Sequence, residues 1–242
     1  MYNAYLFDLY GTLVDIKTDE QSAEVWHKLA TFYGYHGAYY EPVELEQAYH
    51  TEEEVLRKKA IHEYGKGSYP EIVLEQVFLK LFAKKGVTVS NEMAVHTGQF
   101  FRILSLQYIK LYRNVEWMLQ TLKHKQKKIY LLSNAQRIFT DYEMNYLGIK
   151  PYFDGILFSS DAGFMKPDIR FYQKAIHMFS VDPKKAIMIG NDYTCDILGA
   201  KEAGLDAFYV HTNLSPAMPD QLEEERWMMG MDGAKLVKRV TE

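Results

Sequence analysis

This sequence of 242 residues lacks several features that would point to particular classes of protein. It has one cysteine, which excludes an internal disulfide and fits a reducing compartment. It has no apolar run of about 18 residues to cross a membrane, and its N-terminus lacks the regions of a signal peptide. The net charge of -4 offers no basic surplus for nucleic-acid phosphates. We therefore expect a soluble, cytoplasmic protein that binds neither membrane nor nucleic acid.

Strand-like and helix-like segments alternate along much of the chain. Hydrophobic residues make up 48% of the sequence and charged residues 25%, as in ordinary globular proteins. Strands are expected at residues 5–7, 129–132, 155–158, 186–189, 207–210 and 227–229, and helices at residues 137–147, 169–179, 194–203 and 234–240. This alternation predicts an α/β fold with a doubly wound parallel sheet.

Residues 18–108 follow a different pattern, with apolar residues at helical spacing and no convincing strand. Capping-box sequences at residues 18–21 and 51–54 are expected to begin helices. We expect about four helices, inserted as residues 16–109 into a core made of residues 1–15 and 110–242. Six aromatic residues are expected to pack between these helices, with the lining of a substrate pocket as the alternative: Trp26, Phe32, Tyr33, Tyr35, Tyr39 and Tyr40.

Polar side chains stand where four of the predicted strands end. They are Asp8, Ser133, Asp161 with Lys166 close behind it, and Asp192. A lone aspartate in such a place is usually a turn residue or a helix cap. Ligands of open α/β sheets, however, bind at the carboxyl ends of the strands. The four ends together therefore predict one site with carboxylate, hydroxyl and amine groups.

Four short segments resemble the motifs of the haloacid dehalogenase-like (HAD) hydrolase superfamily, in the family's order. They are residues 7–15 (FDLYGTLVD), 133–134 (SN), 166–168 (KPD) and 190–196 (GNDYTCD). The resemblance implies a hydrolase with a Rossmann-like core. It also implies that residues 16–109 are a helical cap domain, as in the subgroup whose cap follows the first motif.

The resemblance implies roles for the residues of the first three motifs. Asp8 would be the nucleophile and would form a covalent aspartyl intermediate. Ser133 and Asn134 would bind the substrate, and Lys166 would neutralise charge near Asp8. Thr12 is the hydroxyl residue that the family usually carries in the first loop.

A magnesium site is implied as well. Mg²⁺ would be held by Asp8, the carbonyl oxygen of Tyr10 and Asp192, since this ion prefers one or two carboxylates completed by phosphate and water. In some relatives the metal-binding aspartate comes one residue earlier; Asn191 stands there in this chain, and Asp192 would take over. Asp196 would support the site, with a place in the first turn of its helix as the alternative.

Two departures from the family bear on the reaction. Family phosphatases carry an acid–base aspartate two residues after the nucleophile, where this chain has Tyr10, as the family's dehalogenases do. Tyr172 also matches a dehalogenase tyrosine, although a packed aromatic is the favoured interpretation. Against this, the dehalogenases need no metal and use an early cap arginine. This sequence keeps Asp192 and Asp196 and has no arginine before Arg57.

These observations together predict a Mg²⁺-dependent phosphatase of a small phosphorylated metabolite. A metal-independent 2-haloacid dehalogenase and a non-catalytic ligand-binding protein are the alternatives. The single cysteine, Cys195, lies among acidic residues that disfavour its thiolate, so we expect it to fill space. The sequence leaves the substrate and the oligomeric state open.

Overall fold

A computed structural model describes residues 2–65, 67–223 and 225–241 of the chain. At its centre is a six-stranded sheet in the order β5-β4-β1-β6-β7-β8, in which every neighbouring pair is parallel. The strands are β1 (Ala4–Phe7), β4 (Lys128–Ser133), β5 (Gly155–Phe158), β6 (Ala186–Gly190), β7 (Asp206–His211) and β8 (Trp227–Met229). The predicted α/β fold is confirmed, and each of the predicted strands is present.

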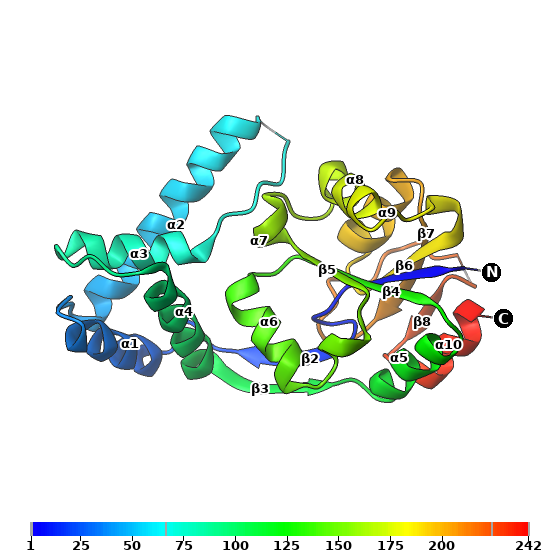
Figure 1. Ribbon diagram of the computed structural model, residues 1–242, viewed down its shortest axis with the longest axis horizontal. Helices are drawn as coiled ribbons and strands as arrows, with labels where there is room; N and C mark the ends of the chain where they lie inside the picture. Colours follow the sequence, from blue (N-terminus) through cyan, green and yellow to red (C-terminus); the bar gives the residue numbers. More distant parts are fainter. Residues whose placement is uncertain (1, 66, 224, 242) are drawn as a thin grey trace.

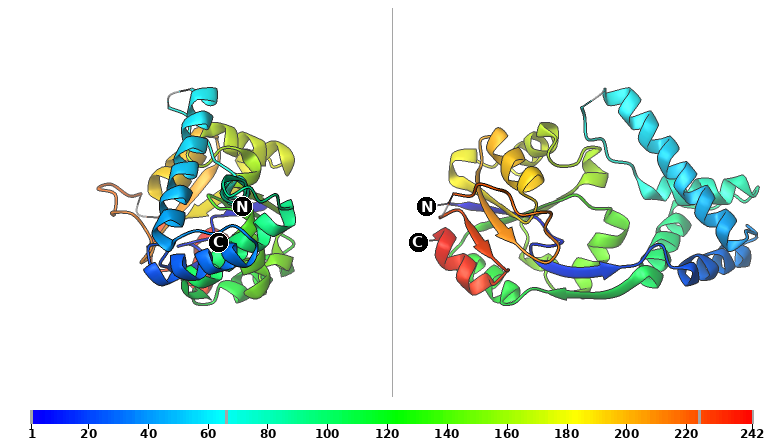
Figure 2. Two further views of the ribbon diagram at one scale, coloured as in Figure 1. Left: turned by 90° about the vertical axis from the view of Figure 1, so that its left-hand side faces the viewer. Right: turned by 180° about the vertical axis from the view of Figure 1, so that it is seen from behind.

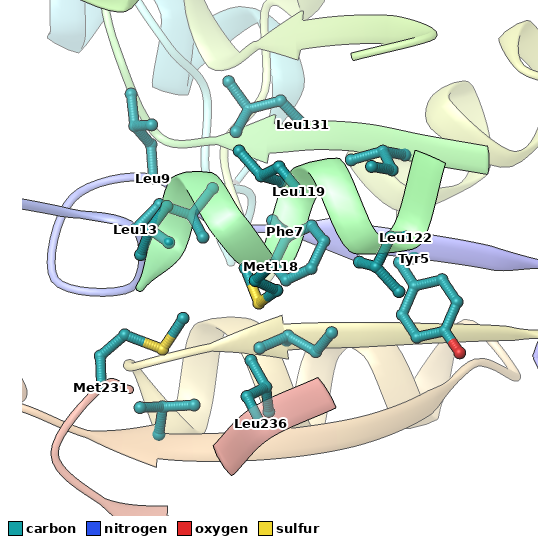
Figure 3. Close-up of a cluster of buried hydrophobic side chains, with 14 of the residues drawn as sticks. Tyr5, Phe7, Leu9, Leu13, Met118, Leu119, Leu122, Leu131, Met231 and Leu236 are labelled. Carbon is teal, nitrogen blue, oxygen red and sulfur yellow. The ribbon is translucent and has the colours of Figure 1, made fainter. Parts of the chain in front are cut away.

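Helices α5 (Val115–His124) and α10 (Gly233–Thr241) cover one face of this sheet, and α8 (Ile169–Met178) and α9 (Gly199–Glu202) cover the other (Figures 1 and 2). Helices α6 (Arg137–Tyr146) and α7 (Ser159–Ala162) lie toward the carboxyl ends of the strands (Figure 1). Single turns occur at Lys150–Tyr152 and Pro183–Lys185, and a wider turn at Tyr193–Leu198. In β1, Tyr5 and Phe7 pack with α5 and α10 (Figure 3), whereas Leu6 packs with α8. Because successive side chains point to opposite, covered faces, the strands are apolar throughout.

Four further helices pack around an apolar cluster of their own, beyond the carboxyl ends of the strands (Figure 1). They are α1 (Ala23–Tyr35), α2 (Pro42–Tyr64), α3 (Leu74–Lys84) and α4 (Asn91–Ser105). Four of the six aromatic residues pack into this cluster as predicted: Trp26, Phe32, Tyr33 and Tyr40. The prediction is wrong for Tyr35 and Tyr39, which are exposed.

Two strands, β2 (Val14–Thr18) and β3 (Leu106–Leu111), form a separate antiparallel ribbon that joins α1 and α4 to the sheet (Figure 1). The prediction that residues 18–108 contain no strand is therefore wrong at both ends of that range. Most side chains of the ribbon are partly exposed, so the apolar alternation that reveals a strand is weak there. The division at residues 15/16 and 109/110 stays a prediction, and both points lie within the ribbon.

Both predicted capping boxes are wrong. Helix α1 begins after Ser22, and Thr51 lies inside α2, where its hydroxyl donates to the Gln47 carbonyl oxygen at 2.7 Å. A capping box does exist at the start of α2, formed by Glu41 and Glu44. Within the part of the chain that the structure describes, every helix is too short or too polar to cross a bilayer.

Candidate active site

A cavity of about 210 Å³ lies at the carboxyl ends of β1, β4 and β6. Its lining consists of Asp8, Tyr10, Ser133, Asn134, Lys166, Asn191, Asp192, Cys195, Asp196, Leu214 and Pro216. The structure thus brings together most of the residues that the sequence places in one site, with Asp161 as the exception. Thr12 lies behind this lining and donates to Asp8 Oδ2 at 3.1 Å.

Lys166 provides the positive charge of the cavity. Its ammonium lies 2.8 Å from Asp8 Oδ1, 2.6 Å from Asp196 Oδ1 and 2.9 Å from the Leu132 carbonyl oxygen, so all three donors are used. Burial lowers the pKa of Lys166, but the two carboxylates outweigh burial and hold the pKa above its ordinary value. Lys166 is therefore a fixed cation beside Asp8.

Asn134 fixes the Lys166 segment to the end of β4. Its side-chain amide donates to the Lys166 carbonyl oxygen at 2.9 Å and accepts from the Lys166 N–H at 2.7 Å. Ser133, the last residue of β4, is buried and borders the cavity next to it. Asn134 thus uses its amide on the backbone, and Ser133 is the hydroxyl that β4 brings to the site.

The Asn191 amide lies near the other carboxylate oxygen of Asp8, Oδ2. Its atom facing the first loop lies 3.0 Å from the Tyr10 carbonyl oxygen, 3.3 Å from Asp8 Oδ2 and 3.1 Å from Thr12 Oγ1. As a nitrogen, this atom has all three oxygens within donor distance and can satisfy those of Tyr10 and Asp8 with its two protons. As an oxygen, it competes with Asp8 for the single proton of the Thr12 hydroxyl. Asp8, Tyr10 and Asn191 then present oxygens to one another, and a bound cation would remove the repulsion between them. We call these three groups the oxygen cluster.

Gly11 and Asp192 explain why Asn191 takes this place. Gly11 has a φ of +85°, and a Cβ there would overlap the Asn191 amide. Asp192 also borders the cavity, but its Oδ1 accepts from the Cys195 N–H at 2.9 Å and caps the following turn. In residues 2–65, 67–223 and 225–241, no three His, Cys, Asp or Glu side chains are grouped to hold a metal. A cation at this site would therefore depend on the Tyr10 carbonyl and the Asn191 amide.

The two tyrosines that raised the dehalogenase alternative both have their hydroxyls engaged by the protein. The Tyr10 hydroxyl donates to the Glu143 carboxylate on α6 and lies 2.9 Å from Thr140 Oγ1, and burial raises its pKa above the ordinary value. Tyr172 is fully buried and donates to the Cys195 carbonyl oxygen. The interpretation of Tyr172 as a packed aromatic is confirmed, and the Tyr10 phenol is poorly suited to proton transfer at Asp8.

Asp161 does not belong to the site, and that prediction is wrong. Its carboxylate accepts from Arg137 Nε at 2.7 Å outside the cavity. Leu214 and Pro216, which do line the cavity, follow β7. The rule that ligands bind at the carboxyl ends of strands therefore applies to β7 as well.

The thiol of Cys195 lies between two carboxylates, as expected. Burial, followed by the charges of Asp192 and Asp196, raises its pKa to about 12. The thiol is therefore protonated at neutral pH and fills space in the wall of the cavity.

The chain belongs to the haloacid dehalogenase-like hydrolase family, whose model matches residues 2–204. Glyceraldehyde 3-phosphate phosphatase of Methanothermobacter thermautotrophicus is 28% identical over 183 residues, which are 76% of each chain. Phosphoserine phosphatase of Thermus thermophilus is 30% identical over 110 residues, 46% of this chain and 44% of that enzyme. The structure of 2-haloacid dehalogenase from Pseudomonas syringae matches 100% of this chain and 99% of its own, with a TM-score of 0.64 and 20% identity. The chain is thus a hydrolase whose sequence relatives include phosphatases.

Proposed function

We propose that this hydrolase is a Mg²⁺-dependent phosphatase of small phosphorylated metabolites, acting through a phosphoryl group carried on Asp8. The relatives named as phosphatases support this class of reaction. The observation that carries the proposal is the Asp8 carboxylate, with Lys166 on its Oδ1 and the Tyr10 carbonyl and Asn191 amide near its Oδ2. When the Asn191 amide turns its oxygen to the first loop, these groups form the oxygen cluster.

The charge of the cavity supports a bound divalent cation. The lining holds three carboxylates and one ammonium: Asp8, Asp192, Asp196 and Lys166. This balance leaves a net negative charge in a partly buried cavity, which would repel a phosphate dianion. A divalent cation removes that repulsion.

The oxygen cluster fits Mg²⁺ in the chemistry of its donors, since Mg²⁺ prefers one or two carboxylates completed by other oxygens, phosphate and water. The Asn191 amide atom lies 3.0 Å from the Tyr10 carbonyl oxygen and 3.3 Å from Asp8 Oδ2, so the three groups are close enough to share one cation. We therefore assign Asp8, Tyr10 and Asn191 as ligands in place of the predicted set with Asp192. When bound, Mg²⁺ supplies positive charge toward the phosphate oxygens.

The remaining chemistry comes from the side chains themselves. A carboxylate oxygen of Asp8 attacks phosphorus, the bond to the leaving oxygen breaks, and water then hydrolyses the acyl phosphate. Lys166 holds the other oxygen of Asp8 in place, and Ser133 is positioned to donate to the transferring group. Tyr10 gives the leaving oxygen no proton, so substrates with good leaving groups should react fastest.

The test is phosphate release from p-nitrophenyl phosphate with Mg²⁺ and with EDTA, using Asp8→Asn as the control. We expect turnover that requires Mg²⁺ and disappears in Asp8→Asn. Equal turnover by that variant, or turnover unaffected by EDTA, would reject the proposal. A screen of phosphorylated metabolites would then identify the substrate.

Metal-independent hydrolysis of 2-haloacids is the second candidate. The observation that favours it is the other orientation of Asn191, in which the amide nitrogen satisfies the three oxygens without a cation. Asp8 would then displace halide from carbon, and water would hydrolyse the resulting ester. Halide release in EDTA supports this candidate, and its absence across short 2-haloacids rejects it.

A further inference from the structure

The side chain of Tyr10 connects the loop after Asp8 to helix α6. Its hydroxyl donates to the Glu143 carboxylate and lies 2.9 Å from Thr140 Oγ1. Thr140 and Glu143 are both buried. The residue whose carbonyl oxygen belongs to the oxygen cluster is thus anchored through its side chain to another part of the fold.

Glu143 extends this connection to the inserted helices. Its Oε1 lies 3.0 Å from Nε of Arg102, which comes from the last turn of α4. The Arg102 guanidinium also lies over the Phe139 ring, 4.5 Å from its centroid, and 3.4 Å from Glu20. The side chains of Arg102 and Glu143 are 15% and 9% exposed, so water screens this ion pair less than a surface pair.

Helices α4 and α6 approach closely at the same place. A Cβ on Gly98 of α4 would overlap the Ile138 side chain of α6, so the helices could not be this close with a larger residue there. Ile138 and Phe139 belong to the apolar cluster of the insertion, whereas Met144 of the same helix belongs to the cluster beneath the sheet. A movement of α4 would therefore act on α6, and through it on Glu143.

The loop that follows Asp8 is too tight to absorb such a movement. The Gly11 N–H donates to the Val14 carbonyl oxygen at 2.8 Å, and the Leu13 N–H donates to the Leu9 carbonyl oxygen at 2.8 Å. The phenol and the carbonyl of Tyr10 are held on one Cα within this loop. A shift of the phenol would therefore turn the carbonyl oxygen relative to Asp8.

We propose that Tyr10 is a positioning residue, which acts through Glu143 and Arg102 to make cation binding at the oxygen cluster depend on the place of helix α4. The effect on cation binding rests on the proposed function. The mechanical coupling between α4 and the loop after Asp8 is independent of that function. Tyr10, which stands where an acid–base group is expected, thus has a positioning role instead.

The first test measures Mg²⁺ affinity by calorimetry in the unaltered protein, Tyr10→Phe, Arg102→Met and the double variant. We expect each single change to weaken binding about tenfold, because Tyr10→Phe removes a hydrogen bond to the Glu143 carboxylate and Arg102→Met removes the cation paired with it. The double variant should bind no more weakly than either single one, because both changes break the same connection. Arg102→Lys, which keeps the charge, should recover part of the affinity.

Tyr146→Phe and Arg113→Met are the matched controls, since these side chains are 79% and 80% exposed. Both should bind Mg²⁺ as the unaltered protein does. Unchanged affinity in Tyr10→Phe, or losses that multiply in the double variant, would overturn the proposal.

The second test needs no metal. Hydrogen exchange of residues 11–14, followed by mass spectrometry in EDTA, reports the opening of the loop. Arg102 makes no hydrogen bond or ion pair with those residues in the part of the chain that the structure describes. If α4 and the loop are coupled through Glu143, residues 11–14 should exchange about threefold faster in Arg102→Met. Their exchange should be unchanged in Arg113→Met.

Unchanged exchange in Arg102→Met would overturn the coupling, whatever the calorimetry gives. If the unaltered protein binds no Mg²⁺, the proposed function fails, and the exchange measurement alone decides the coupling. The two failures are therefore distinguishable.

Discussion

Replacing Asn191 by aspartate tests the proposed ligand set most directly. The amide atom of Asn191 lies 3.3 Å from Asp8 Oδ2 and 3.0 Å from the Tyr10 carbonyl oxygen. In Asn191→Asp a carboxylate takes this place, and two unit charges this close repel by about 5 kcal/mol at an effective dielectric constant of about 20. Relaxation of the loop and partial protonation of the two carboxylates reduce this repulsion. We expect the metal-free variant to lose about 2–4 kcal/mol of unfolding free energy.

Magnesium should reverse this loss. A second carboxylate matches the ligands that Mg²⁺ prefers, so the variant should bind the ion about ten- to a hundredfold more tightly. For a chain of this size, about 2–4 °C accompanies each kcal/mol. Thermal unfolding in EDTA should therefore show a midpoint about 5–15 °C lower than that of the unaltered protein, and saturating Mg²⁺ should restore most of it.

Asp192→Asn serves as the control for this experiment. Asp192 caps a helical turn through the Cys195 N–H, so its loss should cost about 1 kcal/mol or less, equally in EDTA and in Mg²⁺. A deficit of Asn191→Asp that Mg²⁺ does not relieve would refute the reasoning. Loss of Mg²⁺ binding in Asp192→Asn would also refute it and would return the ligand role to Asp192.

Three other outcomes are expected. Aryl phosphates should be hydrolysed about a hundredfold faster than alkyl phosphates, since Tyr10 supplies no acid; similar steady-state rates would contradict this. Lys166→Met leaves Asp8 and Asp196 buried without their cation and should cost about 3–5 kcal/mol in urea unfolding, whereas a cost under about 1 kcal/mol would contradict the buried pairing. Asp161→Asn should change kcat by less than about twofold, and a tenfold fall would place Asp161 in the site.

The location of the site could be predicted because it follows from the sheet alone. Parallel strands end at one edge, so polar residues that follow buried apolar runs must gather there. This holds for Asp8, Ser133 and Asp192. It fails for Asp161, because β5 is the edge strand and continues directly into α7, where the carboxylate meets Arg137.

Elements that depend on a distant partner were harder to predict. The ribbon of β2 and β3 joins residues about 90 positions apart, and its half-exposed side chains show little apolar alternation. The contacts of Tyr10 with Thr140 and Glu143 likewise span about 130 residues. The sequence identifies Tyr10 as unusual, but its partners on α6 become apparent only in the folded chain.

The choice between Asn191 and Asp192 shows where spacing alone stops being informative. Neighbouring residues in a turn can point in different directions, and both residues stand at positions that the family uses. Here the backbone of Asp192 is extended, with φ -103° and ψ 110°, and its carboxylate folds forward onto the Cys195 N–H. Asn191 is thereby left to face the first loop, which Gly11 opens by lacking a Cβ. A neutral amide at this position can meet the oxygens of Asp8 and Tyr10 both with and without a cation, whereas a carboxylate can do so only with one. The metal-free protein should therefore be stable, which is what the contrast between Asn191→Asp in EDTA and in Mg²⁺ measures.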